Sequence, residues 1–213
     1  MKLYGYWRSS AAYRVRIALN LKGIRAEHHS VHLVKNGGEQ HAGDYVALNP
    51  QHLVPTLELD DGTVLTQSLA IMEYLEECAG GMKLLPESTI DKALVRAMCL
   101  AVACEVHPLN NLRVLQYLST DMALSDEVKN AWYHHWIHEG FAAIEKMLAR
   151  HSGKYCFGDS PTLADACLIP QVYNARRFNV PLDNYPNIVR IEKHCNSTQA
   201  FIDATPENQP DAQ

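Results

Sequence analysis

Arginine side chains are concentrated towards both ends of the sequence. Arg8, Arg14 and Arg16 lie close together near the N-terminus, and Arg176 and Arg177 are adjacent in the C-terminal part. The guanidinium group makes planar, two-point contacts with carboxylates that lysine cannot reproduce. The formal net charge of −5 argues against a general nucleic-acid surface, which needs clustered positive charge. We therefore expect local sites for small, acidic ligands and no nucleic-acid partner.

Two serines, Ser9 and Ser10, stand where a helix is expected to begin. A helix N-terminus with a hydroxyl donor favours a nearby anion, so the pair could lower the pKa of a thiol. Serine is also a preferred N-cap residue, and the alternative is that both serines only cap the helix. The two roles can coexist in one loop.

Two other patterns have the spacing of functional motifs. His134, His135 and His138 are spaced like metal ligands on a helix, but no motif such as HExxH accompanies them. We expect a solvated helical face there and no metal. Thr162 and Asp165 have the spacing of a capping box ahead of an apolar helical run, which indicates support for folding.

The six cysteines, at positions 78, 99, 104, 156, 167 and 195, form no CxxC pair. Scattered thiols, in a sequence whose N-terminus lacks the features of a secretory signal, are typical of reduced core residues. No apolar run approaches the ~18 residues needed to cross a bilayer. We expect a cytoplasmic protein without a membrane partner.

The N-terminal part of the sequence alternates between strand and helix signals. Four segments have the pattern of strands: 2–6, 26–33, 54–59 and 63–65. Three segments between or after them have helix signals: Ser9 to Gly23, Gln40 to Leu48, and Ser68 to Gly80-Gly81. An Asp-Gly step predicts that the last two strands form an antiparallel hairpin. The order βαβαββα is the thioredoxin-like arrangement of an α/β domain.

The remainder of the sequence has long apolar segments of helical period, at 89–119, 125–150 and 163–178. They predict an all-α domain. We place the domains at 1–81 and 88–213. The polar, proline-containing tail at 205–213 is expected to be loosely held.

Several motifs occur together in a specific order. They are Arg8-Ser9-Ser10 running into Tyr13–Leu19, Asn49-Pro50, Val54-Pro55, Gln67-Ser68, His107–Asn111, Gly158-Asp159, Thr162–Asp165 and Gln171–Phe178. Over almost the whole chain they resemble zeta-class glutathione transferases, and in particular the bacterial isomerases of maleylacetoacetate or maleylpyruvate. The resemblance implies a glutathione-transferase fold, glutathione as cofactor, a homodimer, and isomerisation of a small dicarboxylic keto acid.

The resemblance also implies roles for individual residues. Ser9 would stabilise the glutathione thiolate, with Ser10 beside it. Ala11 stands where the family often has cysteine, so the chemistry would depend on the sulfur of glutathione itself. The further residues implied to contact the cofactor are Gln40, Val54, Gln67, Ser68, His107, Asn111 and Arg113.

Some of these assignments have alternatives. Gln40 could be an exposed polar side chain, and Ser68 a plain N-cap. The resemblance implies a cis bond between Val54 and Pro55. His107 and Asn111 lie four residues apart and would project from one helical face if Pro108 lies in a bend or a first turn. The resemblance places both at the domain cleft, although a lone His107 would more often be structural.

For a substrate with a carboxylate at each end, Arg8 and Arg177 are the expected anchors, and Arg113 resembles the bacterial branch of the family. The alternative for each is an ordinary ion pair. A general glutathione transferase or peroxidase would need an apolar acceptor pocket, and a non-catalytic module would usually have lost the residues that hold glutathione. Nothing in the sequence separates maleylacetoacetate from maleylpyruvate as substrate.

Overall fold

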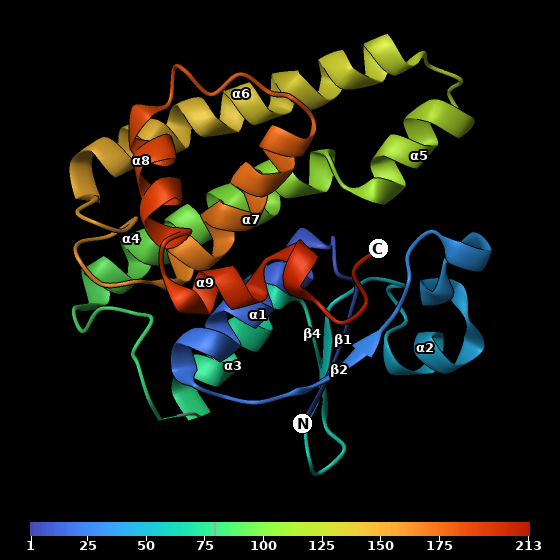
Figure 1. Cartoon of the computed structure of the whole chain (residues 1–213), viewed down its shortest axis with the longest axis horizontal. Coiled ribbons are helices and arrows are strands. Elements are labelled where there is room, and N and C mark those ends of the chain that lie inside the picture. The colour runs from blue at the N-terminus through green and yellow to red at the C-terminus, as the bar shows by residue number, and fades with distance from the viewer. Residues whose placement is uncertain (79) are drawn as a thin grey trace. The chain divides into compact units, whose positions relative to one another are not determined.

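The computed structural model describes residues 1–78 and 80–213, which fold into two compact units (Figure 1). One unit joins Met1–Leu84 to the C-terminal segment Asn196–Gln213. The other unit spans Leu85–Cys195.

The first unit is built on a four-stranded mixed sheet with the strand order β2-β1-β3-β4. Its strands are β1 (Lys2–Gly5), β2 (Glu27–Ser30), β3 (Thr56–Glu58) and β4 (Val64–Thr66). β1 runs parallel to β2 and antiparallel to β3, and β3 and β4 form the predicted antiparallel hairpin. The thioredoxin-like arrangement is as predicted, but most of the strands are shorter than expected. Apolar residues beside them, among them Tyr6, Val31 and Val54, pack into a hydrophobic cluster from loops instead.

The helices of this unit's N-terminal part are α1 (Ser10–Lys22), α2 (Gly43–Leu48) and α3 (Ser68–Cys78), with the 3-10 turns η1 (Lys35–Gly37) and η2 (Glu39–His41) before α2. α1 ends at Gly23, whose φ of 67° favours glycine. Its residues Ala12, Val15 and Ile17 are fully buried, because α1 packs against both α3 and the C-terminal segment.

The C-terminal segment forms α9 (Gln199–Ala204) and the 3-10 turn η5 (Pro206–Asn208), and α9 packs against α1. Phe201 is fully buried, and the Gln209 side chain donates hydrogen bonds to the carbonyls of Asp203 and Thr205. The prediction of a loosely held tail is therefore wrong. The expected helical domain over 88–213 also extends too far, because this last segment packs with the first unit.

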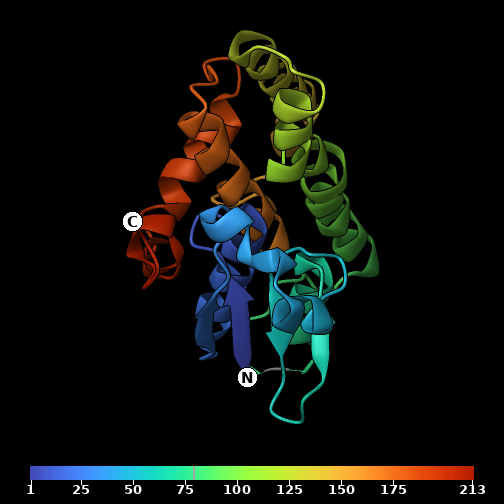
Figure 2. The same cartoon turned by 90° about the vertical axis from the view of Figure 1, so that its right-hand side faces the viewer.

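The second unit is helical (Figure 2). Its elements are α4 (Thr89–Leu100), the π-helix η3 (Ala101–Val106), the 3-10 turn η4 (His107–Leu109), α5 (Leu112–Thr120), α6 (Asp126–His151), α7 (Leu163–Arg177) and α8 (Pro186–Cys195). The first long helical segment expected from the sequence is thus divided at Asn110 and Asn111, and α8 was not predicted.

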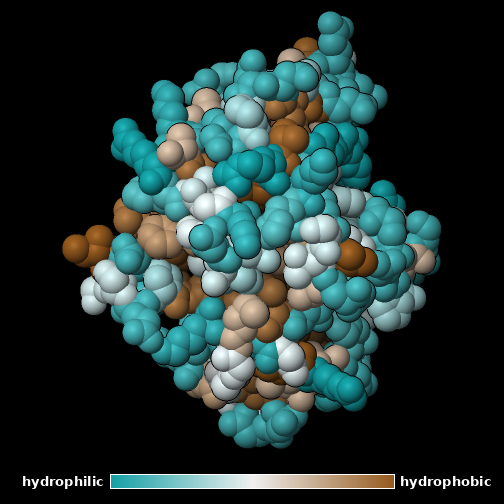
Figure 3. Space-filling view, turned by 60° about the vertical axis from the view of Figure 1, so that its left-hand side comes forward, coloured by the Kyte–Doolittle hydropathy of each residue, from teal (hydrophilic) through white to brown (hydrophobic). Residues whose placement is uncertain are grey.

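The described helices include none that is both long and apolar enough to span a membrane. On the face shown in Figure 3, hydrophilic side chains cover most of the surface, and hydrophobic ones lie between them in small groups. The exposed large hydrophobic residues of the second unit include Ile90 and Leu100 on α4 and Tyr117 on α5.

The capping box predicted from Thr162 and Asp165 is present at the start of α7. Asp165 is fully buried, and its carboxylate accepts hydrogen bonds from the Thr162 amide at 2.8 Å and the Cys156 amide at 2.7 Å. The Thr162 hydroxyl donates a third at 3.0 Å. One carboxylate therefore ties the preceding loop to the helix.

Asp165→Ala is expected to lower the free energy of unfolding by roughly 3 kcal/mol or more, because each buried donor left without an acceptor costs about 1–3 kcal/mol. Urea denaturation measures this loss. Asp159→Ala is the matched control, since exposed Asp159 accepts a single bond from the Lys154 amide at 3.0 Å, and it should cost about 1 kcal/mol or less. Equal losses in the two variants would contradict the role of Asp165.

Candidate functional site

The loop Tyr6–Ser10, called here the serine loop, joins β1 to α1. Ser9 Oγ accepts a hydrogen bond from the Ala12 amide at 3.2 Å and so caps α1. A hydroxyl can accept and donate at once, so this cap leaves the Ser9 proton for a neighbouring anion. Ser10 is the first helical residue and is buried, and Ala11 in the same turn brings no thiol. Capping and stabilisation of an anion are therefore compatible at Ser9.

The second loop of the site carries Val54, and the bond from Val54 to Pro55 is cis, as predicted. The Tyr45 hydroxyl donates to the Leu53 carbonyl at 2.6 Å, and Asn49 Nδ2 donates to the same carbonyl at 2.8 Å. Burial raises the pKa of Tyr45, which keeps this hydroxyl a donor. Among the described residues, the Val54 backbone amide and carbonyl have no hydrogen-bond partner. They can pair with the backbone of a bound peptide.

The third segment of the site is Gln67-Ser68, where α3 begins. Gln67 has a φ of 67°, and its Nε2 donates to Gln51 Oε1 at 2.8 Å. Ser68 is buried, and its Oγ accepts a hydrogen bond from Arg14 Nη1 at 3.2 Å. A helix N-terminus favours a carboxylate, and the guanidinium group beside Ser68 adds positive charge. This segment therefore suits an acidic ligand group.

These three segments are linked within the first unit. Val54 packs in one hydrophobic cluster with Tyr6 and Trp7 of the serine loop. The hydrogen bond between Gln51 and Gln67 connects the second segment to the third. Arg14 of α1 donates a hydrogen bond to Ser68, which joins the third segment to the helix that follows the serine loop.

Gln40 is buried in η2, so the alternative of an exposed side chain is wrong. Its Nε2 lies 3.5 Å from the Leu33 carbonyl, and its Oε1 has no partner within the described residues. The amide retains unused hydrogen-bonding capacity. Contact between Gln40 and glutathione stays a prediction.

The arginines of the N-terminal part differ in their surroundings. Arg14 and Arg16 are buried, and Arg16 donates to the carbonyls of Trp7 and Ala204, each at 3.0 Å. The guanidinium group of Arg16 thus holds parts of the first unit together. Arg8, in contrast, is exposed, and its guanidinium carbon lies 4.2 Å from the centroid of the Trp7 ring. No acidic partner is found for Arg8 in the part of the chain that the structure describes.

In the second unit, two adjacent arginines differ in the same way. Arg176 forms a bidentate ion pair with Glu192, with Nε donating to Oε1 at 2.6 Å and Nη2 donating to Oε2. Arg177, the last residue of α7, is exposed, and its guanidinium carbon lies 4.9 Å from the centroid of the Phe178 ring. No described residue forms an ion pair with Arg177. Arg176 is therefore structural, whereas Arg177 is available to a ligand.

His107 and Asn111 do not project from one helix, in contrast to the expectation. His107 begins η4, and the chain then leaves helical geometry, so that Asn111 has a ψ of 164°. Asn111 is the N-cap of a new helix, α5, with its Oδ1 accepting a hydrogen bond from the Val114 amide at 3.1 Å. The intervening Asn110 is buried and donates to a backbone carbonyl of α6. Arg113, in the first turn of α5, is exposed and has no acidic partner among residues 1–78 and 80–213.

The histidines of α6 are only partly solvated. His134 Nε2 pairs with the Phe178 carbonyl and His138 Nδ1 with the Tyr185 hydroxyl, both at 2.8 Å, while His135 is exposed. The expectation of a solvated face therefore holds for His135 alone. Burial lowers the pKa of His138. The described residues contain no group of three His, Cys, Asp or Glu side chains arranged to hold a metal ion.

Two regions of the sequence match known protein families. Residues 8–78 match the glutathione S-transferase N-terminal domain, and residues 130–191 match the glutathione S-transferase C-terminal domain. A protein of Vibrio cholerae, named a probable maleylacetoacetate isomerase, is 50% identical over 210 residues, which cover 99% of this chain and 97% of that protein. The chain belongs to the glutathione S-transferase family.

Solved structures of the zeta class are closely similar to this glutathione S-transferase. The holo structure of a maleylpyruvate isomerase, described as a bacterial zeta-class glutathione S-transferase, has a TM-score of 0.96 and 46% identity, with both chains covered completely. A maleylacetoacetate isomerase of Methylobacterium extorquens AM1, with bound malonate and GSH, has a TM-score of 0.95 and 40% identity over the whole of both chains. The resemblance to the zeta class and its fold is thus confirmed.

Two residues that support the site of this glutathione S-transferase were not singled out from the sequence. Tyr45 donates a hydrogen bond to the Leu53 carbonyl, next to Val54, and Gln51 accepts one from the Gln67 side chain. Both flank the Asn49-Pro50 motif, which was the available signal. The motif alone does not show which neighbouring side chains reach the loop backbone.

Proposed function

We propose that this glutathione S-transferase isomerises the cis double bond of maleylacetoacetate to give fumarylacetoacetate. Bound glutathione supplies a thiolate that adds reversibly to the double bond, so that the bond can rotate before the thiolate leaves. Glutathione is regenerated, and no group is transferred in the net reaction. The protein has to favour the thiolate and hold the two ends of a dicarboxylic keto acid.

The residues of the first unit suit the three parts of glutathione. The Ser9 hydroxyl and the N-terminus of α1 favour the thiolate. The unpaired backbone groups of Val54 suit the cysteinyl residue. Gln67 and Ser68, supported by Arg14, suit the γ-glutamyl carboxylate. Further contacts are proposed from the resemblance at Ser10, Ala11, Gln40, His107, Asn111 and Arg113.

The observation that carries the choice of a diacid substrate is the contrast between Arg176 and Arg177. Glu192 neutralises Arg176, whereas Arg177 is exposed without an acidic partner among the described residues. A guanidinium group in this state suits a substrate carboxylate. Arg8 is likewise exposed and has no acidic partner among the described residues, and it is proposed as the second anchor. In the Methylobacterium extorquens relative, the bound dicarboxylate malonate accompanies GSH.

The maleylpyruvate isomerase with a TM-score of 0.96 favours maleylpyruvate as a second candidate substrate. The two substrates differ at the end remote from the isomerising bond. The ratio of kcat/KM for the two diacids decides between them, and neighbouring genes for tyrosine or gentisate degradation give an independent answer. A general transferase would instead conjugate apolar electrophiles at a comparable or higher rate than it isomerises either diacid.

We infer further that the enzyme is a cytoplasmic homodimer. The resemblance supports a dimer, and exposed Ile90, Leu100 and Tyr117 offer apolar contacts to a second copy. Sedimentation equilibrium should then give twice the chain mass of 23.9 kDa. The six free cysteines fit a reducing compartment, which fractionation of the source cells tests.

The proposed function first predicts a strict need for glutathione, because position 11 is alanine and no thiol of the protein stands in the first turn of α1. Dialysed enzyme should not change the absorbance of a maleyl keto diacid. Added glutathione should restore turnover and should be recovered unconsumed. Full activity after complete removal of glutathione would exclude the proposed chemistry.

The second prediction concerns the carboxylate anchors. Arg177→Lys keeps the charge but loses the planar fork, so kcat/KM for the diacid should fall about tenfold, which corresponds to ~1.4 kcal/mol. Arg8→Ala should act in the same direction. Arg176→Lys is the matched control and should reduce stability while leaving kcat/KM close to wild type. If Arg177→Lys and Arg8→Ala keep the wild-type value, the two residues are not anchors.

The third prediction separates the two serines. Ser9→Ala should raise the pKa of the bound glutathione thiol by about one to two units, because a hydrogen bond to a charged group is worth ~1.5–3 kcal/mol. At neutral pH kcat should fall about ten- to hundredfold, and the deficit should shrink as pH rises through the new pKa. Thiolate absorbance against pH measures the shift. Ser9→Thr keeps the hydroxyl, so the thiol pKa should stay close to that of the wild type. A larger rise in Ser10→Ala than in Ser9→Ala would reverse the assignment of the two serines.

A further inference from the structure

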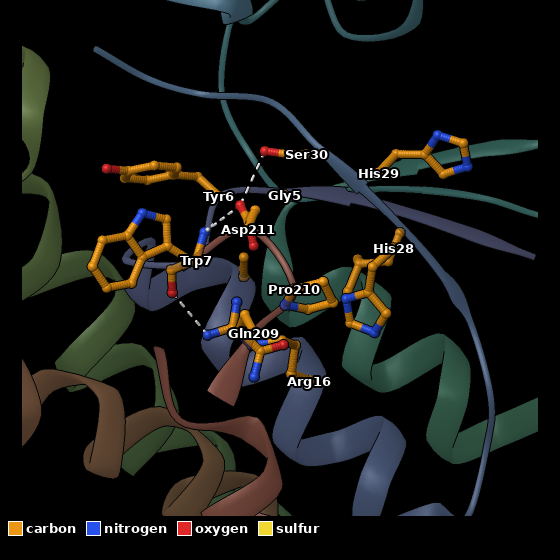
Figure 4. Close-up of a pocket in the computed structure, with 12 residues that line it drawn as sticks. Gly5, Tyr6, Trp7, Arg16, His28, His29, Ser30, Gln209, Pro210 and Asp211 are labelled. Carbon is orange, nitrogen blue, oxygen red and sulfur yellow. Dashed lines mark hydrogen bonds between the residues drawn. The ribbon is translucent and has the colours of Figure 1, made fainter. Parts of the chain in front are cut away.

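The C-terminal segment is hydrogen-bonded directly to the serine loop. Asp211 Oδ2 accepts a hydrogen bond from the Trp7 amide at 3.1 Å and another from the Ser30 hydroxyl at 3.0 Å (Figure 4). Trp7 lies just before Ser9 in the loop, and Ser30 is the last residue of β2. One carboxylate oxygen thus joins the serine loop to the neighbouring strand.

Arg16 holds the other side of the Trp7 backbone. Its Nη2 donates to the Trp7 carbonyl, and its Nε donates to the Ala204 carbonyl at the end of α9, each at 3.0 Å. Within the loop, the Ser9 amide donates to the Tyr6 carbonyl at 2.9 Å. The Trp7 amide is therefore held by Asp211 of the C-terminal segment. The Trp7 carbonyl is held by Arg16, which is itself hydrogen-bonded to that segment at Ala204.

A pocket of about 240 Å³ lies along this junction, with Arg16, Ser30, Gln209 and Asp211 among its lining residues (Figure 4). Each of these four side chains forms a hydrogen bond with neighbouring protein atoms. Beyond the pocket, Ala212 packs against the hydrophobic cluster that contains Trp7 and Val54. The polar and apolar contacts of the tail thus converge on the parts of the first unit that carry the site.

We propose that Asp211 is a positioning residue for the serine loop: its carboxylate fixes the Trp7 amide, so that the Ser9 hydroxyl and the first turn of α1 are held towards the thiol of glutathione. The proposal rests on the proposed function through the role given to Ser9. Charge-assisted hydrogen bonds are stronger than neutral ones, which suits this fixing role. Without the carboxylate, the Trp7 amide would turn to water and the loop would open more readily.

The test compares Asp211→Ala, Asp211→Asn and the control Asp203→Ala in complex with glutathione, without substrate. Asp203 lies in the same C-terminal segment, is exposed, and its side chain accepts a bond from Gln199 at 2.6 Å. The thiol pKa, read from thiolate absorbance against pH, should rise by about one unit in Asp211→Ala, which means about tenfold less thiolate below that pKa. The affinity for glutathione should change less than about threefold, because the other contacts remain.

The sign of the shift separates positioning from simple electrostatics. Removing a negative charge by itself can only lower a thiol pKa, so a rise requires a change in the position of the thiolate's donors. Asp211→Asn keeps a neutral acceptor oxygen and should show a smaller rise than Asp211→Ala. Hydrogen exchange in the peptide that contains Trp7 should quicken in Asp211→Ala and stay at the wild-type rate in Asp203→Ala.

A thiol pKa in Asp211→Ala that is unchanged or lowered overturns the proposal, even where the melting temperature falls, because the tail would then act on stability alone. If Asp211→Ala does not fold, Asp211→Asn provides the same comparison. A shift in Ser9→Ala without one in Asp211→Ala overturns only the role of Asp211. No shift in Ser9→Ala overturns the role of Ser9 in the proposed function.

Discussion

The first turn of a helix has amide groups without partners inside the helix, and in the proposed function those of α1 favour the thiolate of bound glutathione. The serine loop bonds to the helix end at Ser9, whose Oγ accepts a hydrogen bond from the Ala12 amide and whose carbonyl accepts one from the Tyr13 amide. The backbone of Trp7 is instead fixed from behind, at its carbonyl by Arg16 and at its amide by Asp211. Side chains outside the serine loop therefore hold its backbone at Trp7.

The other two segments of the site follow the same rule. Tyr45 and Asn49 both bond to the Leu53 carbonyl, and the backbone groups of the next residue, Val54, remain unpaired within the described residues. At the start of α3, Arg14 contacts the Ser68 hydroxyl and leaves the helix N-terminus for a carboxylate. In each case a buried side chain fixes the segment, and the groups suited to a ligand are left free for it.

Several parts of the fold that the sequence predicted correctly depend on local hydrogen bonds. Gly23 ends α1, the Asp-Gly step closes the hairpin, and Thr162 with Asp165 caps α7, and each signal lies within a few residues of its effect. The contact between Trp7 and Asp211 joins residues 204 positions apart, and no local pattern announces it. For the same reason a polar tail looked loosely held, although its polar side chains bind backbone groups of the first unit.

Arginine shows how little residue type alone decides. No sequence pattern predicts that Glu192 pairs with Arg176 and not with Arg177, because this pairing depends on the packing of α8 against α7. An acidic partner both restrains a guanidinium group and neutralises it. An aromatic ring restrains the group and leaves its N–H edge and its charge to a carboxylate.

Arg8 beside the Trp7 ring and Arg177 beside the Phe178 ring are held in this second way. Trp7 thus serves two purposes at once. Its backbone is the point at which the serine loop is fixed, and its ring supports the adjacent arginine. A change in the position of Trp7 would therefore alter both the proposed donor to the thiolate, Ser9, and the proposed anchor for the substrate, Arg8. This coupling makes the environment of one buried tryptophan a determinant of both halves of the proposed reaction, the activation of the thiol and the orientation of the diacid.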